Sequence, residues 1–127
     1  MPATARILAV DDEPELTELM HYHLVRAGYT VDTAANGWEA IHAVRAHRPD
    51  IILLDLMLPD LDGFGVCEIL RRDPDTATIP IIIVSAWSST DSRNLGLELG
   101  ALDYITKPFQ PRDLVGRVDR LMHARAG

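Results

Sequence analysis

Short apolar runs alternate five times with longer stretches in which apolar residues recur every three or four positions. The short runs are rich in Ile, Val and Leu and lack polar alternation, which is typical of parallel strands covered on both faces. The longer stretches have the period of amphipathic helices; Leu16, Leu19 and Met20, for example, fall on one helical face. The pattern predicts strands at about residues 6–10, 30–34, 51–55, 79–84 and 102–106, and helices at about residues 14–27, 37–47, 63–72, 90–99 and 111–124.

Signals for helix starts and ends agree with these positions. Pro14 suits a first helical turn, Gly28 suits a helix end, and Ser89-Thr90-Asp91 offers side chains that cap a helix N-terminus. Strict alternation of strand and helix favours one parallel sheet with right-handed crossovers and helices on both faces. We therefore expect residues 1–127 to form a single α/β domain, a three-layer (βα)₅ sandwich.

Charge and cysteine content narrow the function classes. The net charge of −7 argues against a surface that binds nucleic acid or anionic membrane. The sequence has no apolar run as long as a membrane-spanning helix, and its first residues lack the apolar core of a signal peptide. Cys67 is the single cysteine, so no disulfide can form within the chain. We expect a cytoplasmic protein whose domain binds neither nucleic acid nor membrane.

Aspartates stand at the ends of two predicted strands. Asp11 and Asp12 follow the first strand, and Asp55 ends the third. The carboxyl ends of parallel strands meet at one edge of the sheet, so these three carboxylates converge if the two strands are neighbours. Like charges at close range are unfavourable unless a cation neutralises them, and ligands that are all oxygen suit Mg²⁺. The sequence thus predicts a Mg²⁺ site around one reactive aspartate.

Five motifs occur in order, each at the end of a predicted strand. They are the pair Asp11-Asp12, the segment 55–63 (Asp-Leu-Met-Leu-Pro-Asp-Leu-Asp-Gly), the pair Ser85-Ala86, Tyr104, and the segment 107–109 (Lys-Pro-Phe). Together they resemble the receiver domain of the two-component response regulators, over essentially the whole chain. The resemblance implies a flavodoxin-like fold with strand order 2-1-3-4-5, which places the first and third strands side by side.

The same resemblance assigns the phosphoacceptor and the metal ligands. It implies that Asp55 is phosphorylated, because a carboxylate can attack phosphorus to give an acyl phosphate. Asp12 and Asp55 would ligate Mg²⁺ directly, Asp11 would act through water, and Met57 would contribute its backbone carbonyl. Mn²⁺ would substitute for Mg²⁺. Such a domain is a phospho-accepting signalling domain rather than an enzyme, with self-catalysed phosphotransfer and autodephosphorylation expected.

Three further residues complete the implied machinery. Lys107 would contact a phosphoryl oxygen, or Asp55 itself before phosphorylation. The bond between Lys107 and Pro108 resembles one that is cis in the family. Ser85 would bond the new phosphoryl group, and Tyr104 would turn inward as Ser85 moves. Apart from the resemblance, Trp87 stands two residues after Ser85, close to the predicted site, and our hypothesis is that it shields the acyl phosphate from water.

Partners also follow from the resemblance. The phosphoryl donor would be a sensor histidine kinase or a histidine phosphotransfer protein, and a downstream effector protein or domain would receive the signal. The switching surface would comprise the fourth helix, fifth strand and fifth helix. Residues 107–118 resemble the winged-helix transcription-factor subfamily, whose receivers form homodimers through this face. Arg93 with Asp113, and Asp103 with Arg117, match its inter-subunit ion pairs, whereas Leu99, Leu102 and Ala124 depart from the subfamily pattern.

Three alternatives share parts of this pattern. A flavodoxin-type FMN protein would have a Ser/Thr/Gly-rich phosphate loop after the first strand, whereas this chain has Asp-Asp-Glu-Pro there. An aspartyl phosphatase of the haloacid-dehalogenase class would place a second aspartate two residues after the nucleophile, where Met57 stands. A receiver without its chemistry would serve only as a docking module. The set of Asp11, Asp12, Asp55, Ser85 and Lys107 favours the phospho-accepting receiver over all three.

Overall fold

One parallel sheet of five strands in the order β2-β1-β3-β4-β5 forms the centre of the molecule. The computed structural model describes residues 4–126. Strand and helix alternate strictly, as the apolar pattern predicts. The elements are β1 (Arg6–Val10), α1 (Pro14–Arg26), β2 (Thr30–Ala34), α2 (Gly37–Ala46), β3 (Ile51–Leu54), α3 (Gly63–Arg72), β4 (Ile81–Ser85), α4 (Thr90–Glu98), β5 (Asp103–Thr106) and α5 (Pro111–Ala126).

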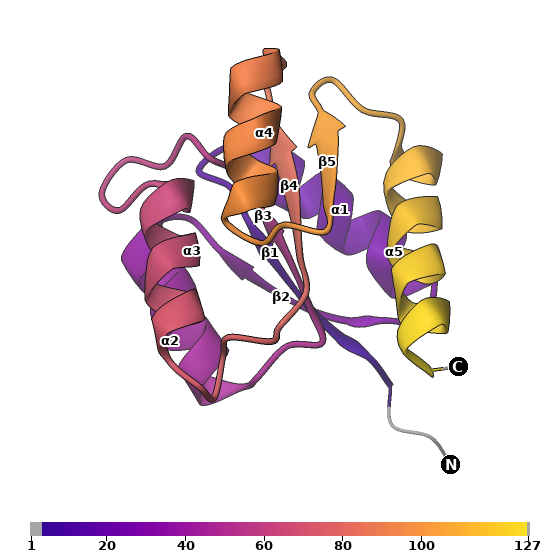
Figure 1. The fold of residues 1–127 in the computed structure, drawn as a ribbon. Helices are drawn as coiled ribbons and strands as arrows, with labels where there is room; N and C mark the ends of the chain where they lie inside the picture. Colours follow the sequence, from indigo (N-terminus) through magenta and orange to yellow (C-terminus); the bar gives the residue numbers. More distant parts are fainter. Residues whose placement is uncertain (1–3, 127) are drawn as a thin grey trace.

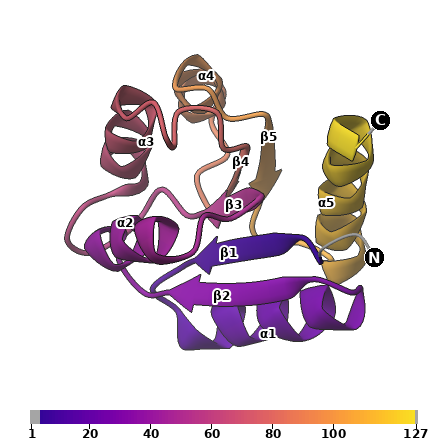
Figure 2. The same ribbon diagram turned by 90° about the horizontal axis from the view of Figure 1, so that it is seen from below.

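The helices form two outer layers (Figures 1 and 2). α1 and α5 cover one face of the sheet, and α2, α3 and α4 cover the other. Each interface is a separate apolar core, because strand residues alternate between the two faces. β3 lies in the middle and every residue in it is fully buried, which explains its uninterrupted apolar sequence. The expected flavodoxin-like strand order is confirmed.

Side chains from the predicted turns cap several helices. Asn36 accepts a hydrogen bond from the Glu39 amide at 2.8 Å at the start of α2, and Asp62 accepts one from the Gly65 amide at 2.8 Å at the start of α3. Ser89 caps α4 in the same way. After α1, Gly28 adopts a φ of +103°, a left-handed conformation that glycine tolerates best.

The element boundaries differ from the predicted ones at several positions. β4 begins at Ile81 rather than at residue 79, because the Ile79 amide bonds the Thr76 carbonyl in the preceding turn and Pro80 has no amide hydrogen to donate. β5 begins at Asp103 rather than at residue 102, and β3 ends at Leu54, one residue before Asp55. Helices α1, α2 and α4 each end one residue earlier than predicted, and α5 extends two residues further, to Ala126.

The strand order brings the aspartate-bearing strand ends together. β1 pairs with β3 in parallel register, so that Val10 lies opposite Leu54. The residues that follow, Asp11 and Asp55, therefore leave the sheet side by side at its carboxyl edge. Among the described residues, no helix is long and apolar enough to cross a membrane.

Candidate functional site

Three carboxylates converge at the carboxyl ends of β1 and β3. One oxygen each from Asp11, Asp12 and Asp55 lies within 4.8 Å of the others. Asp11 and Asp55 are buried, at 1% and 3% exposure, whereas Asp12 is exposed. Backbone hydrogen bonds fix the buried pair: the Asp11 amide donates to the Ala34 carbonyl and the Asp55 amide to the Val10 carbonyl, both at 3.1 Å. The convergence expected from the strand order is therefore present.

Lys107 reaches into this cluster from the end of β5. Its ammonium lies 2.9 Å from Asp55 Oδ2 and 2.6 Å from Asp11 Oδ2, with the side chain only 11% exposed. The Lys107 amide donates to the Ser85 carbonyl at 2.9 Å, and the bond to Pro108 is cis. The ammonium thus neutralises part of the buried negative charge.

Burial and ion pairing act in opposite directions on these groups. Burial raises the pKa of Asp11 above its usual range, although the close Lys107 ammonium and the hydrogen bond from the Glu13 amide both act to lower it. Burial acts to lower the pKa of Lys107, but its contacts with the Asp11 and Asp55 carboxylates outweigh this and raise that pKa. The lysine is therefore charged at neutral pH.

One oxygen of the cluster is left without a hydrogen bond. Asp11 Oδ2 is a buried side-chain oxygen with no hydrogen-bond partner among the described residues. Its 2.6 Å contact with Lys107 is an ion pair whose angles do not meet hydrogen-bond geometry. A buried carboxylate oxygen in this state favours a hard cation as a further partner. The donor set of carboxylate oxygens is typical of a Mg²⁺ site, so the residues fit the expected metal.

Met57 and Ser85 lie beside the aspartates. The Met57 amide donates to Asp55 Oδ1 at 3.1 Å, and this contact orients the Asp55 carboxylate. The metal-binding role of the Met57 carbonyl stays a prediction. Ser85 is fully buried at the end of β4, and its hydroxyl accepts a hydrogen bond from the Trp87 amide at 3.2 Å.

Tyr104 is buried and connected to the same loop. Its hydroxyl donates to the backbone carbonyl of Trp87, and the Arg93 guanidinium lies 5.0 Å above its ring. The Trp87 side chain, 41% exposed, stacks on Phe64 with ring centroids 6.1 Å apart. Sequence reasoning missed the Phe64 contact, because it joins α3 to the loop after β4 and has no local sequence signal.

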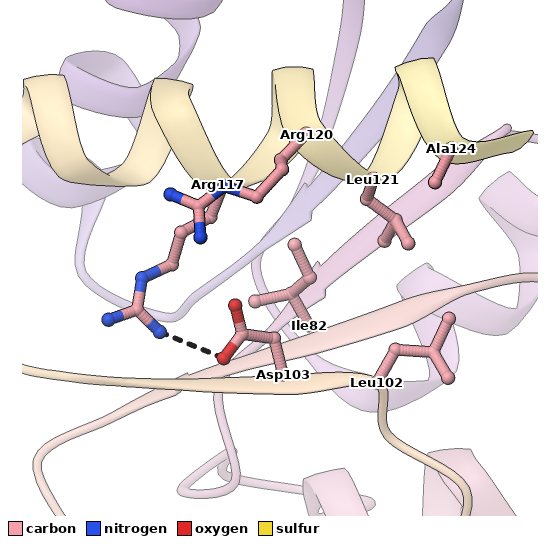
Figure 3. Close-up of a pocket in the computed structure, with 7 residues that line it drawn as sticks. All are labelled: Ile82, Leu102, Asp103, Arg117, Arg120, Leu121 and Ala124. Carbon is pink, nitrogen blue, oxygen red and sulfur yellow. Dashed lines mark hydrogen bonds and ion pairs between the residues drawn. The ribbon is translucent and has the colours of Figure 1, made fainter.

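The residues of the expected dimer face pair within one chain. Arg117 on α5 contacts Asp103 at 2.8 Å (Figure 3). Arg117 also contacts Asp113 at 3.3 Å. Arg93 donates to the Thr106 hydroxyl at 2.7 Å, and within the described residues no ion pair joins Arg93 to Asp113. Arg117 thus has two partners in its own chain before any second subunit is present.

Comparison with known proteins agrees with this geometry. The sequence model of the response regulator receiver domain matches residues 7–119, so the chain belongs to that family of phospho-accepting signalling domains, which are not enzymes in the ordinary sense. Membership sets aside the FMN-binding and phosphatase alternatives.

Two transcriptional regulators are similar to this chain in sequence. The chain is similar to the alkaline phosphatase synthesis transcriptional regulatory protein PhoP of Bacillus subtilis, with 45% identity over 92% of this chain and 48% of that protein. It is also similar to the DNA-binding response regulator MtrA of Mycolicibacterium smegmatis, with 46% identity over 89% of this chain and 48% of that protein. The chain therefore spans about half the length of these two relatives.

A solved structure shows the same likeness in three dimensions. The chemotaxis protein CheY4 of Vibrio cholerae superposes with a TM-score of 0.88 at 32% identity, covering 93% of this chain and 98% of that one. The agreement extends over nearly the whole length of both chains, so the helices and strands described above are arranged as in that solved chemotaxis protein.

Proposed function

We propose that Asp55 accepts a phosphoryl group from the phosphohistidine of a sensor histidine kinase or a histidine phosphotransfer protein. The observation that carries this proposal is the burial of Asp55 at 3% exposure, within reach of Asp11 and Asp12 and ion-paired with Lys107. Buried acidic clusters with a specific cationic partner occur preferentially at functional sites. Family membership supplies the donor class.

The reaction is a displacement at phosphorus. An oxygen of the Asp55 carboxylate attacks, the P–N bond to the donor histidine breaks, and the electron pair stays on the imidazole nitrogen, which takes up a proton. Mg²⁺, when bound, supplies neutralisation of charge on the phosphoryl oxygens. Asp12 and Asp55 would hold it directly, Asp11 through water and Met57 by its carbonyl. Mn²⁺, which also accepts oxygen ligands in octahedral geometry, would substitute.

Lys107 and Ser85 then stabilise the product. Lys107 exchanges its contact with the Asp55 carboxylate for one with a phosphoryl oxygen, and the Ser85 hydroxyl moves toward the phosphate and away from the Trp87 amide. Each charge-assisted hydrogen bond contributes roughly 1.5–3 kcal/mol. A shift from mostly inactive to mostly active requires about 5.5 kcal/mol. Together these two bonds contribute about 3–6 kcal/mol before the contacts they replace are subtracted, which is of the order of that value. Tyr104 would follow Ser85 as the switch residue.

The output surface is the α4-β5-α5 face, and we propose that phosphorylation favours a homodimer through it. Arg117 and Asp103 would exchange their bond within the chain for one between subunits. Arg93 would leave the Thr106 hydroxyl, and Asp113 would leave Arg117, to pair with each other across the interface. Leu102, 56% exposed on this face, would be covered in the dimer. PhoP and MtrA are named as a transcriptional regulatory and a DNA-binding protein, so we propose transcriptional control as the downstream output, in the cytoplasm.

Intact mass spectrometry tests the chemistry. We expect wild type incubated with acetyl phosphate and Mg²⁺ to gain one phosphoryl group, and Asp55→Asn to gain none. The wild-type gain should also disappear when the metal is chelated. A folded wild-type protein without any gain would refute the proposal and leave the chain a docking module whose acidic cluster does no chemistry.

A further inference from the structure

Residues 56–62 form the loop that follows Asp55, and the side chain of Asp60 in this loop is hydrogen-bonded to helix α2. Asp60 lies between β3 and α3, and its carboxylate accepts hydrogen bonds from the amides of Gly37 at 2.9 Å and Trp38 at 3.4 Å. These are the first two amides of α2, which have no acceptor inside the helix. The cap that α2 carries itself, Asn36, bonds only the next amide, that of Glu39. Asp60 therefore completes the cap of α2 from another element.

Other features hold the two segments together at this point. A Cβ atom added to Gly37 would lie 2.0 Å from the Leu61 carbonyl oxygen, so the start of α2 is in direct backbone contact with the loop. Burial acts to raise the pKa of Asp60, but hydrogen bonds from the amides of Leu61, Gly37 and Trp38 together lower it below its usual range. The carboxylate is charged and well satisfied, as expected for an anion at a helix N-terminus.

The loop itself is short and held at both ends. At its start the Met57 amide bonds Asp55, and at its end the Gly63 amide donates to the Leu56 carbonyl at 3.0 Å. Between these bonds, Leu58 is buried and Pro59 has a restricted φ. Asp60, three residues after Met57, supplies the side-chain contact that fixes the middle of the loop to the rest of the molecule.

We propose that Asp60 is a positioning residue of the phosphoacceptor site, which holds the 56–62 loop against α2 so that the Met57 carbonyl faces the acidic cluster. This rests on the proposed function, in which that carbonyl ligates Mg²⁺. Groups that support metal ligands typically change metal affinity by about 10–100-fold when removed. Because Asp60 acts on Met57 through the intervening backbone of residues 58 and 59 rather than on a ligand atom, we expect the lower end of that range, about tenfold.

The experiment compares two ways of weakening the same helix cap. Asp60→Ala removes the hydrogen bonds between the loop and α2, and Asn36→Ala removes a cap whose hydrogen bond lies within α2. Asp60→Asn is a milder variant that keeps one acceptor oxygen. For each protein, Mg²⁺ affinity is measured by calorimetry, stability by urea unfolding, and the rate of phosphorylation by acetyl phosphate as a function of Mg²⁺.

We expect both alanine variants to be less stable than wild type but only Asp60→Ala to bind Mg²⁺ about tenfold more weakly. Its phosphorylation rate should fall at low Mg²⁺ and recover when the metal saturates, because the chemistry itself is unchanged. Asp60→Asn should lie between wild type and Asp60→Ala. Wild-type Mg²⁺ affinity in Asp60→Ala, or an equal loss in Asn36→Ala, would overturn the proposal.

The same data separate this inference from the proposed function. Wild type that binds Mg²⁺ but gains no phosphoryl group would overturn the function and leave the role of Asp60 intact. If wild type is phosphorylated and Asp60→Ala shows the same Mg²⁺ dependence as wild type, the proposed function stands and the role of Asp60 is overturned. Wild type that binds no Mg²⁺ would overturn both.

Discussion

Removal of the Lys107 ammonium tests the electrostatics of the site most directly. Lys107→Ala leaves Asp11 and Asp55, at 1% and 3% exposure, without their cation. Loss of one partner from a buried ion pair costs about 3–5 kcal/mol, because an uncompensated charge stays buried. Domains of this size have a total stability of about 5–15 kcal/mol, so the metal-free variant should be folded but marginal. The corresponding fall in Tm is roughly 10–20 °C.

Two conditions should reverse this loss. Mg²⁺ supplies the missing positive charge, so saturating Mg²⁺ should stabilise Lys107→Ala more than it stabilises wild type. Lower pH should act in the same direction. Burial already raises the pKa of Asp11 in the folded state, and without Lys107 that pKa rises further. The folded variant then binds more protons than the unfolded chain, so its stability increases as pH falls from about 7 toward about 5.

Urea unfolding at both pH values, with and without Mg²⁺, measures these effects. Arg72→Ala is the matched control, because it removes an exposed pair with Glu68 at 3.9 Å, whose side chains are 83% and 57% exposed. That change should cost less than about 1 kcal/mol and show no response to Mg²⁺. A Lys107→Ala variant as stable as the control variant, or one that Mg²⁺ stabilises no more than wild type, would refute the reasoning.

Three further predictions concern residues around the site. Trp87→Ala should lose phosphate faster than wild type if the indole shields the acyl phosphate, which intact mass over time will show; an unchanged half-life contradicts shielding. Arg117→Ala should change stability by less than about 1 kcal/mol, since its ion pairs are partly exposed, and should weaken phosphorylation-dependent dimerisation in gel filtration. Burial raises the pKa of Cys67 to about 11, so iodoacetamide near pH 8 should modify it only in urea; rapid labelling of the folded protein would contradict its burial.

The strand-end residues could be predicted from the sequence because the physics that places them is simple. A continuous apolar run becomes a buried parallel strand, and the residue after it must leave the sheet at the carboxyl edge. Asp11 and Asp55 required only the strand order in addition, and the family motifs supplied that order. Lys107 was identified through the resemblance, by its place before Pro108 and directly after the fifth strand. The site could therefore be located from local patterns plus one topological fact.

Contacts between loops could not be predicted in this way, because no sequence pattern marks them. Asp60 stands in a turn-rich segment where an aspartate is common for local reasons, and nothing in the chain marks the Gly37 amide as its partner. Phe64 and Trp87 are 23 positions apart, and their stacking follows from tertiary packing alone. The start of β4 was misplaced for a related reason: Ile79 is fully buried, as a strand residue would be, yet its amide belongs to a turn. The apolar pattern of a sequence therefore predicts which residues are buried more reliably than it predicts which backbone amides join a strand.

The element expected to move in the switch is weakly held by apolar burial. Gly96 is the one buried residue within α4, and Leu95 and Leu97 on the same helix are 43% and 52% exposed. A Cβ atom on Gly96 would lie 2.6 Å from Ile83 Cδ1, so the helix approaches the sheet closely there but with little side-chain surface. Segments with few buried apolar contacts open at low free energy. We therefore expect the few hydrogen bonds proposed for the phosphoryl group to be enough to displace α4, because little buried apolar surface holds this helix in place.

The two ends of α4 are not held equally. Arg71 donates to the carbonyls of Leu99 at 3.3 Å and Gly100 at 3.1 Å, and the same guanidinium bonds the turn before β4, so the C-terminal end is fixed to the body of the domain. The N-terminal end follows the loop at Trp87, whose peptide donates to Ser85 and accepts from Tyr104. If Ser85 turns to a phosphoryl group as proposed, the first of these bonds would be lost and the loop would be released from β4. Displacement should accordingly begin at the N-terminal end of α4, with the Arg71 contacts as its fixed point.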